Sequence, residues 1–210
     1  MSRPFIIAGP CSAESEESLL RVAHDLKAVG TDAFRAGLWK PRTHPGSFSG
    51  VGSEGIGWML EVKRSTGLPI ATEVLDATHA ELCRNAGFDI LWIGARTTSN
   101  PYLVQEIAEA LSGAPVTVLV KNPLSPDLEL WTGALERFGE AGVGEIVAVH
   151  RGFTPVGKTK YRNEPYWEAA LSMKGRFPGM RMLCDPSHIA GKAGYVAGIA
   201  GRAVDLGFDG

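Results

Sequence analysis

The sequence predicts an α/β fold, a (β/α)8 TIM barrel whose eighth strand and final helix are missing from the 210 residues. Short apolar runs alternate seven times with segments of helical period, which is typical of βα units. The run VTVLV at 116–120 is continuously apolar, as in parallel strands covered on both faces.

A local repeat favours a barrel over an open doubly wound sheet. A helix end, a glycine, an acidic residue and a strand follow one another in KAVGTDAFRAG, RNAGFDILWIG and EAGVGEIVAVH. The last six residues, DLGFDG, begin the same pattern again and then stop. We therefore expect one domain over residues 1–210, a barrel that is incomplete at its C-terminal side.

The expected elements follow the chain in order. Ser12 is the expected N-cap of the first helix, because Glu14, Glu16 and Glu17 follow it in the first turn. Strands are expected near 4–8, 32–38, 69–74, 89–94, 115–121, 145–150 and 180–185. Helices are expected near 14–29, 54–66, 76–86, 100–112, 125–141, 164–175 and 191–206.

Composition excludes several functional classes. The net charge of −2 and the lack of Lys/Arg tracts argue against a nucleic-acid partner. No run of 18 apolar residues predicts a membrane span. Three cysteines without metal-finger spacing fit a reducing compartment, so a cytoplasmic protein is expected.

Cations gather where the predicted strands end. Since parallel strands of a barrel end on one face, these side chains predict a focused anion site for one or two substrates with several negative charges. The alternative for Arg96, Lys121 and Arg151 is an ion pair with Glu73 or Asp185 on a neighbouring strand, which is compatible with ligand binding. The six cations are Arg35, Lys40, Arg42, Arg96, Lys121 and Arg151.

Other residues near these strand ends add to the expected site. Gly94 and Ala95 are small enough to let backbone amides approach an anion. Cys11 and His188 follow the first and seventh strands, and their thiolate and imidazole suit a divalent transition metal. Two ligands do not make a metal site, so further ligands would have to come from outside this sequence.

Seven motifs resemble, in order and spacing, the type I family of 3-deoxy-D-arabino-heptulosonate 7-phosphate (DAHP) synthases. They are AGPCS, FRAGLWKPRT, ATEVLD, IGARTT, VLVKN, HRG and CDPSH, and they span essentially the whole chain. KNPLSPDLELWTGALERF and YRNEPYWE resemble the bacterial form fused to a type II chorismate mutase. KPRT at 40–43 separates this family from 3-deoxy-D-manno-octulosonate 8-phosphate synthases, which have a KANRS-type motif there.

The resemblance implies an enzyme that condenses phosphoenolpyruvate with erythrose 4-phosphate and releases phosphate, the first step of the shikimate pathway to aromatic amino acids. It implies a divalent metal (Mn, Fe, Co or Zn) held by Cys11 and His188. The implied substrate contacts are Arg35 and Lys40 for the phosphoenolpyruvate carboxylate, Arg96, Lys121, Arg151 and the amide of Ala95 for its phosphate, and Arg42 and Thr43 for erythrose phosphate.

Lys40 is the expected proton donor to the aldehyde oxygen, and Arg35 is the second expected catalytic residue. Glu73 and Asp185 complete the expected substrate site as partners of its cations. We also expect a homo-oligomer, with a chorismate mutase fused to or associated with it.

Three alternatives stay open. One is an octulosonate 8-phosphate synthase-like enzyme. Another is an aldolase on the same fold that forms a Schiff base through Lys121 and needs no metal. The third is a non-catalytic, truncated chain.

Overall fold

The computed structural model describes residues 3–41, 44 and 46–210. Within these residues, seven parallel strands form one sheet in which each strand pairs with its neighbours in the sequence. The strands are β1 (Ile7–Ala8), β2 (Ala33–Arg35), β3 (Ile70–Val74), β4 (Ile90–Ile93), β5 (Thr117–Lys121), β6 (Glu145–His150) and β7 (Met182–Cys184).

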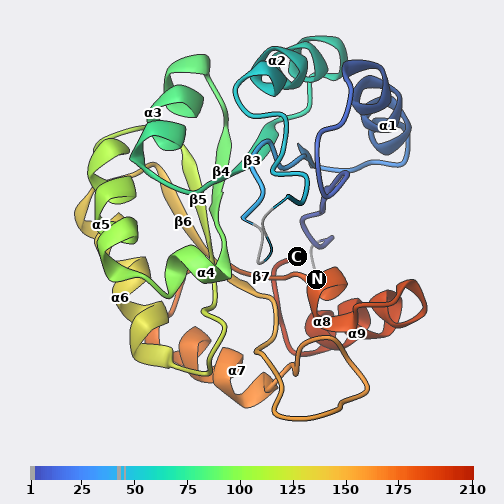
Figure 1. Ribbon diagram of the computed structural model, residues 1–210. Coiled ribbons are helices and arrows are strands. Elements are labelled where there is room, and N and C mark those ends of the chain that lie inside the picture. The colour runs from blue at the N-terminus through green and yellow to red at the C-terminus, as the bar shows by residue number, and fades with distance from the viewer. Residues whose placement is uncertain (1–2, 42–43, 45) are drawn as a thin grey trace.

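Helices follow the strands and form the outer layer of a curled sheet (Figure 1). The described helices are α1 (Glu16–Ala28), α2 (Glu54–Thr66), α3 (Ala77–Ala86), α4 (Ala95–Thr98), α5 (Pro101–Ala110), α6 (Leu128–Glu140), α7 (Trp167–Arg176), α8 (Pro186–Ala190) and α9 (Ala193–Asp205). None of them is long and apolar enough to cross a membrane.

The seven βα units confirm the predicted barrel-type fold, which is open between β1 and β7. The described segments near both ends of the chain lie at this opening (Figure 1). The amide of Phe5 donates to the carbonyl of Asp209 at 2.9 Å, and the amide of Cys184 donates to the carbonyl of Gly210 at 2.9 Å. Residues 209–210 thus occupy the position where the repeat predicted that an eighth strand begins.

The sheet separates two apolar cores. Phe34, Leu91 and Ile93 point outward and pack under the helices, whereas Ala33 and Trp92 point into the barrel. Side chains alternate along a strand, so Arg35 in β2 shares the inward face with Ala33. The same alternation places Glu73 with Ala71, and Lys121 with Leu119. Strand periodicity therefore points three charged side chains into the barrel.

The acidic residue of the repeat ties neighbouring strands together at their N-terminal ends. The carboxylates of Asp32, Asp89 and Asp209 accept from the amides of Ile6, Ile70 and Met182 at 2.7, 2.9 and 2.8 Å. Each also pairs with a cation, which is Arg3, Lys63 or Lys174. Each of these strand amides gains an acceptor in this way, so the contacts stabilise the strand starts, away from the predicted anion site.

Several boundaries differ from those expected. Helix α1 is capped by Ser15, whose hydroxyl accepts from the amide of Ser18 at 3.3 Å, and not by Ser12. The reason is tertiary, because the amide of the fully buried Ala13 donates to the carbonyl of Gly37 at 3.0 Å and holds the preceding segment on the barrel. Helix α7 begins after residue 164 because Phe153 and Glu164 form an antiparallel bridge.

Candidate active site

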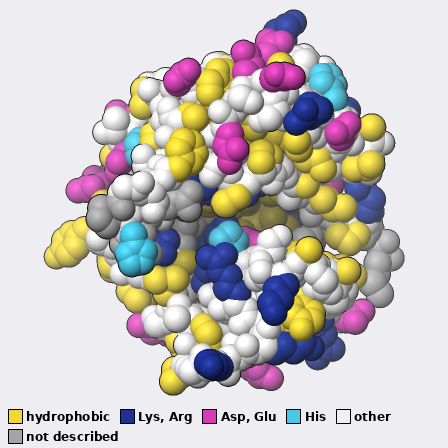
Figure 2. Space-filling model, turned by 45° about the vertical axis from the view of Figure 1, so that its right-hand side comes forward, with side chains coloured by type: hydrophobic (Ala, Val, Ile, Leu, Met, Phe, Trp, Pro, Cys, Tyr) yellow, Lys and Arg dark blue, Asp and Glu magenta, His cyan; other side chains and the backbone are white. Residues whose placement is uncertain are grey.

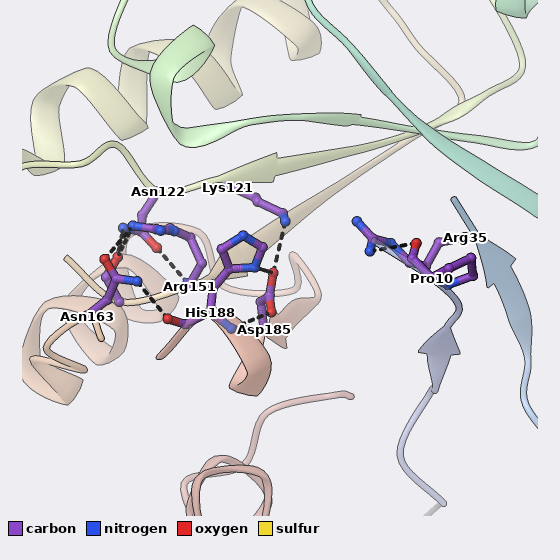
Figure 3. A network of polar contacts seen from close by, with 9 residues as sticks. Pro10, Arg35, Lys121, Asn122, Arg151, Asn163, Asp185 and His188 are labelled. Atoms are coloured by element: carbon purple, nitrogen blue, oxygen red, sulfur yellow. Dashed lines mark hydrogen bonds and ion pairs between the residues drawn. The ribbon is translucent and has the colours of Figure 1, made fainter. Parts of the chain in front are cut away.

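The inward-facing cations meet above the indole ring of Trp92 in β4. The guanidinium carbon of Arg35 lies 4.4 Å from the ring centroid, and the Lys121 ammonium lies 5.6 Å from it. A cation over an aromatic face is attracted by the ring quadrupole. Figure 3 shows Arg35 and Lys121 extending toward each other from opposite sides of the barrel mouth. The buried ring therefore helps to hold both charges at the same end of the barrel.

Asp185, directly after β7, is the anionic centre of the site. Its carboxylate accepts from Lys121 Nζ at 2.8 Å and from His188 Nδ1 at 2.7 Å, and it caps α8 through the His188 amide at 3.1 Å (Figure 3). Burial opposes ionisation of Asp185, but Lys121 and His188 outweigh it and hold its pKa well below the usual range. The structure thus shows the ion-pair alternative for Lys121, with Asp185 as its partner.

His188 is oriented by this contact. The hydrogen bond to Asp185 raises the pKa of His188, but burial and the nearby charges of Lys121 and Arg151 outweigh it and leave the pKa below its ordinary value. With Nδ1 bound to a carboxylate, the other ring nitrogen, Nε2, is left to face a ligand.

Arg151, directly after β6, carries a buried charge. The residue is only 7 % exposed, and its Nη1 donates to Asn163 Oδ1 at 3.1 Å and to the Gly152 carbonyl at 3.2 Å. None of the ion pairs between described residues includes it. Burial lowers the pKa of Arg151 to about 10; the charge of Asp185 opposes this shift, and the charges of Arg162 and Arg96 add to it. An arginine remains protonated under these conditions, so its charge is available to an anion.

Lys40 and Cys11 approach each other around Gly37. A Cβ atom added at Gly37 would lie 2.8 Å from both Lys40 Nζ and the Cys11 carbonyl oxygen. The backbone carbonyl of Cys11 leaves no room for a side chain at position 37, and the glycine there lets the Lys40 side chain lie beside it.

Arg96 and Glu73 frame the other side of the mouth. Arg96 is exposed in α4, and its Nη1 donates to the Pro41 carbonyl at 3.3 Å. Glu73 is only 8 % exposed, and a Cβ atom at Gly94 would lie 2.1 Å from its Oε1, so a side chain there would displace the Glu73 carboxylate. Ala95 opens α4 immediately after this glycine. The predicted site residues Arg42 and Thr43 lie outside the described residues.

The predicted metal site is incomplete in the described part of the chain. No group of three or more His, Cys, Asp or Glu side chains there could hold a metal ion. Cys11 and His188 offer two donors, and a divalent ion needs three or four protein ligands to be held tightly.

The described mouth is a hollow with cationic sides. Figure 2 shows a depression in one face of the molecule, with apolar side chains at its floor and Lys, Arg and His side chains around it. In a chain with a net charge of −2, this clustering focuses positive potential on one opening.

Comparison with known proteins identifies the family. The family model for the DAHP synthetase I family matches residues 2–210. The chain belongs to the DAHP synthetase I family.

Relatives of known structure agree with this family assignment. A phospho-2-dehydro-3-deoxyheptonate aldolase from Thermotoga maritima is 30 % identical over 206 residues, covering 98 % of this chain and 59 % of the relative. The crystal structure of the DAHP synthase from the same organism superposes with a TM-score of 0.86 at 30 % identity, covering 98 % of this chain and 58 % of that one. A truncated form of the Thermotoga enzyme gives a TM-score of 0.82 at 28 % identity, covering 98 % of this chain and 73 % of that one.

A second group of relatives consists of 2-dehydro-3-deoxyphosphooctonate aldolases. A 2-dehydro-3-deoxyphosphooctonate aldolase from Nitratidesulfovibrio vulgaris is 28 % identical over 226 residues, covering all of this chain and 80 % of the relative. This chain of the DAHP synthetase I family thus spans about three fifths of the Thermotoga relative and most of the Nitratidesulfovibrio one.

Two asparagines at the site were not predicted from the sequence. Asn122 Oδ1 accepts from the Arg151 amide at 2.7 Å, and Asn163 contacts the Arg151 side chain. Both are almost fully buried. Asn122 directly follows Lys121, so its position after a strand was a usable signal. Asn163 lies in a loop, and the sequence alone gave no indication of its partner.

We expect His150 to make folding stability fall in acid. Its fully buried ring packs against Phe153, Trp167 and Phe208, and burial lowers its pKa to about 4. Below about pH 6.5, His150 becomes protonated in the unfolded chain but stays neutral in the folded protein. The contribution to stability is therefore complete above pH 6.5 and lost as pH falls through about 4, by roughly 3 kcal/mol in total.

The variant His150→Phe keeps an aromatic ring and removes the titration. Urea unfolding of both proteins between about pH 7.5 and pH 4.5 should show a smaller loss of stability in the variant. An identical pH slope in the two proteins would contradict the assignment.

Proposed function

We propose that this chain carries the catalytic barrel of a 3-deoxy-7-phosphoheptulonate synthase, a transferase that condenses phosphoenolpyruvate with erythrose 4-phosphate and releases phosphate. One observation supports this most directly in a member of this family. The buried Arg151 guanidinium, which makes no ion pair with a described carboxylate, shares one barrel end with the inward-facing Arg35 and Lys121. Such an array suits a substrate with both a carboxylate and a phosphate.

The proposed roles are those that the resemblance to the family implies. Arg35 and Lys40 bind the phosphoenolpyruvate carboxylate. Its phosphate is held by Arg96, Lys121 and Arg151 with the amide of Ala95, while Glu73 and Asp185 fix the cations around it. Arg42 and Thr43 bind the phosphate of erythrose 4-phosphate. These contacts place the reacting carbons together and stabilise the charge that develops between them.

The chemistry joins two carbons and breaks one carbon–oxygen bond. The methylene carbon of the enol phosphate attacks the aldehyde carbon, and Lys40 gives a proton to the aldehyde oxygen. Water adds to the carbon that bears the phosphate and loses a proton. The hydroxyl formed there loses the second proton of that water as phosphate leaves with the electron pair of its bond to that carbon, which yields the 2-keto acid product.

The runner-up is the octulosonate 8-phosphate reaction, since relatives with that product in their name match the chain. An eight-carbon product requires a five-carbon aldose phosphate in place of the four-carbon one. The KPRT motif at 40–43 favours the four-carbon substrate, and Arg42 and Thr43 within it would contact its phosphate.

We expect the complete protein to release phosphate from phosphoenolpyruvate with erythrose 4-phosphate, and much more slowly with arabinose 5-phosphate. The measurement is phosphate release at matched concentrations of the two aldoses. Faster release with the five-carbon aldose would assign the octulosonate reaction. Trapping of a substrate adduct on Lys121 by borohydride would favour the Schiff-base alternative, which has to break the 2.8 Å ion pair with Asp185. No release with either aldose would favour a non-catalytic chain.

The remaining assignments extend this proposal. A divalent metal would use Cys11 and His188 together with further ligands, and metal analysis of the purified protein before and after chelation tests this. A single barrel domain, a homo-oligomer, a fused or associated chorismate mutase and a cytoplasmic location stay predictions.

A further inference from the structure

Asn163 stands out because both halves of its amide are committed to different elements of the site. Its Oδ1 accepts from Arg151 Nη1 at 3.1 Å, and its Nδ2 donates to the His188 carbonyl at 2.6 Å (Figure 3). The opposite orientation would place an NH2 group against a guanidinium and an oxygen against a carbonyl. Only the observed orientation satisfies both partners.

The surroundings hold this side chain in place. Asn163 is 6 % exposed, and its backbone N–H donates to the Ile189 carbonyl at 3.2 Å. A Cβ atom at Gly152, where φ is +76°, would lie 2.9 Å from the Cβ of Asn163. The loop that carries Asn163 is therefore packed against both the Arg151 segment and α8, with little room for the amide to move.

The neutrality of Asn163 matters as much as its position. The Arg151 guanidinium is buried, and its contacts are with neutral oxygens, those of Asn163 and Gly152. A carboxylate at position 163 would form a short ion pair with the Arg151 guanidinium and neutralise its charge. An amide of the same shape supplies an acceptor that aims the guanidinium without neutralising it.

We propose that Asn163 is a positioning residue that aims the Arg151 guanidinium at a bound oxyanion and leaves its positive charge for that anion. This inference rests on the proposed function only for the identity of the anion as the phosphate of phosphoenolpyruvate. The anion-binding role itself stands on the contacts of Asn163 and Arg151.

The test compares three substitutions in the complete protein. Asn163→Asp keeps the shape and the Oδ1 acceptor, adds a charge and loses the Nδ2 donor to the His188 carbonyl, whereas Asn163→Ser and Asn163→Ala lose the whole side-chain amide and add no charge. Asn85→Asp is the matched control, because it adds the same charge at an exposed position at the far end of α3. Inorganic phosphate is titrated calorimetrically into each protein, and thermal unfolding is recorded alongside.

We expect Asn163→Asp to weaken phosphate binding about 100-fold and Asn163→Ala only about 10-fold, since the aspartate competes with the anion for Arg151. Asn85→Asp should bind phosphate like the unchanged protein. A purely structural role predicts the opposite order, with alanine and serine the most damaging and affinity following the melting temperature. Equal affinities for Asn163→Asp and Asn163→Ala would also overturn the proposal.

Turnover separates this inference from the proposed function. If the unchanged protein converts phosphoenolpyruvate and erythrose 4-phosphate, Asn163→Asp should raise the KM for phosphoenolpyruvate more than it lowers kcat. Normal turnover with no special effect of aspartate would refute the role of Asn163 alone. The opposite result is also informative. If the unchanged protein shows no such turnover but Asn163→Asp still loses phosphate binding more than Asn163→Ala, the proposed function is refuted and the positioning role of Asn163 is retained.

Discussion

Replacing Arg151 by alanine should lower kcat/KM for phosphoenolpyruvate by about 1000-fold, and replacing it by lysine by about 100-fold. Arg151 is 7 % exposed and donates to two neutral oxygens. Under the proposed function, alanine removes the charge that would face the substrate phosphate. Lysine keeps a charge but loses the planar fork that serves an oxyanion and Asn163 together.

Steady-state kinetics with each substrate varied in turn measure this effect. Arg202→Ala is the matched control, because Arg202 is exposed in α9 and outside the site. We expect the loss to fall on phosphoenolpyruvate and to leave the KM for erythrose 4-phosphate within a few-fold. Activity of Arg151→Lys within about fivefold of the unchanged protein would show that Arg151 does not bind the transferred phosphate group.

Replacing Asp185 by asparagine should destabilise the protein by about 3–5 kcal/mol at neutral pH. The substitution keeps an oxygen that can cap α8 but leaves the Lys121 ammonium, whose side chain is 12 % exposed, without its carboxylate. An unpaired buried charge is costly, because the attraction that offset its desolvation is gone.

The double variant Asp185→Asn with Lys121→Met isolates the ion pair. It removes both charges, so it should recover part of the stability lost in the single variant. Denaturant unfolding of the single and double variants gives the coupling free energy. A double variant that is less stable than Asp185→Asn by the full cost of Lys121→Met alone would show that the two residues act independently.

The pH dependence of this effect has a defined sign. The pKa of Asp185 is lowered in the folded protein, so its stabilising contribution is present above the pKa of the unfolded chain, near 3.8. That contribution is lost as pH falls further, through the folded pKa. The stability difference between the unchanged protein and Asp185→Asn should therefore be constant around neutral pH and shrink in strong acid.

The position of the site was predictable because parallel strands share one direction. The end of each apolar run was visible in the sequence, so the placement of Arg35, Lys121 and Arg151 at one edge followed from the fold class alone. The glycine–acid repeat was also visible. Its role became clear only in the structure, where Asp89 accepts the Ile70 amide and pairs with Lys63 at the opposite ends of the strands.

The partner of each side chain was less predictable. The sequence left Arg96, Lys121 and Arg151 each open to Glu73 or Asp185, and the structure pairs Lys121 with Asp185 at 2.8 Å. The sequence also predicted Ser12 as the cap of the first helix. In the structure the cap is Ser15, because the backbone hydrogen bond of Ala13 to Gly37 holds the preceding segment on the barrel. Local propensity could not reveal this, since the deciding contact comes from a segment more than twenty residues away.

The sequence by itself therefore determined the order of the βα units, the family and the face on which the charged residues gather, because these depend on periodicity and strand direction. Only the tertiary structure decided which of those charges is neutralised. Lys121 and Asp185 meet because the sheet curls and brings β5 and the end of β7 together, although 64 residues separate them in the chain. Arg151 instead meets the neutral amide of Asn163, and burial there leaves its charge for a ligand.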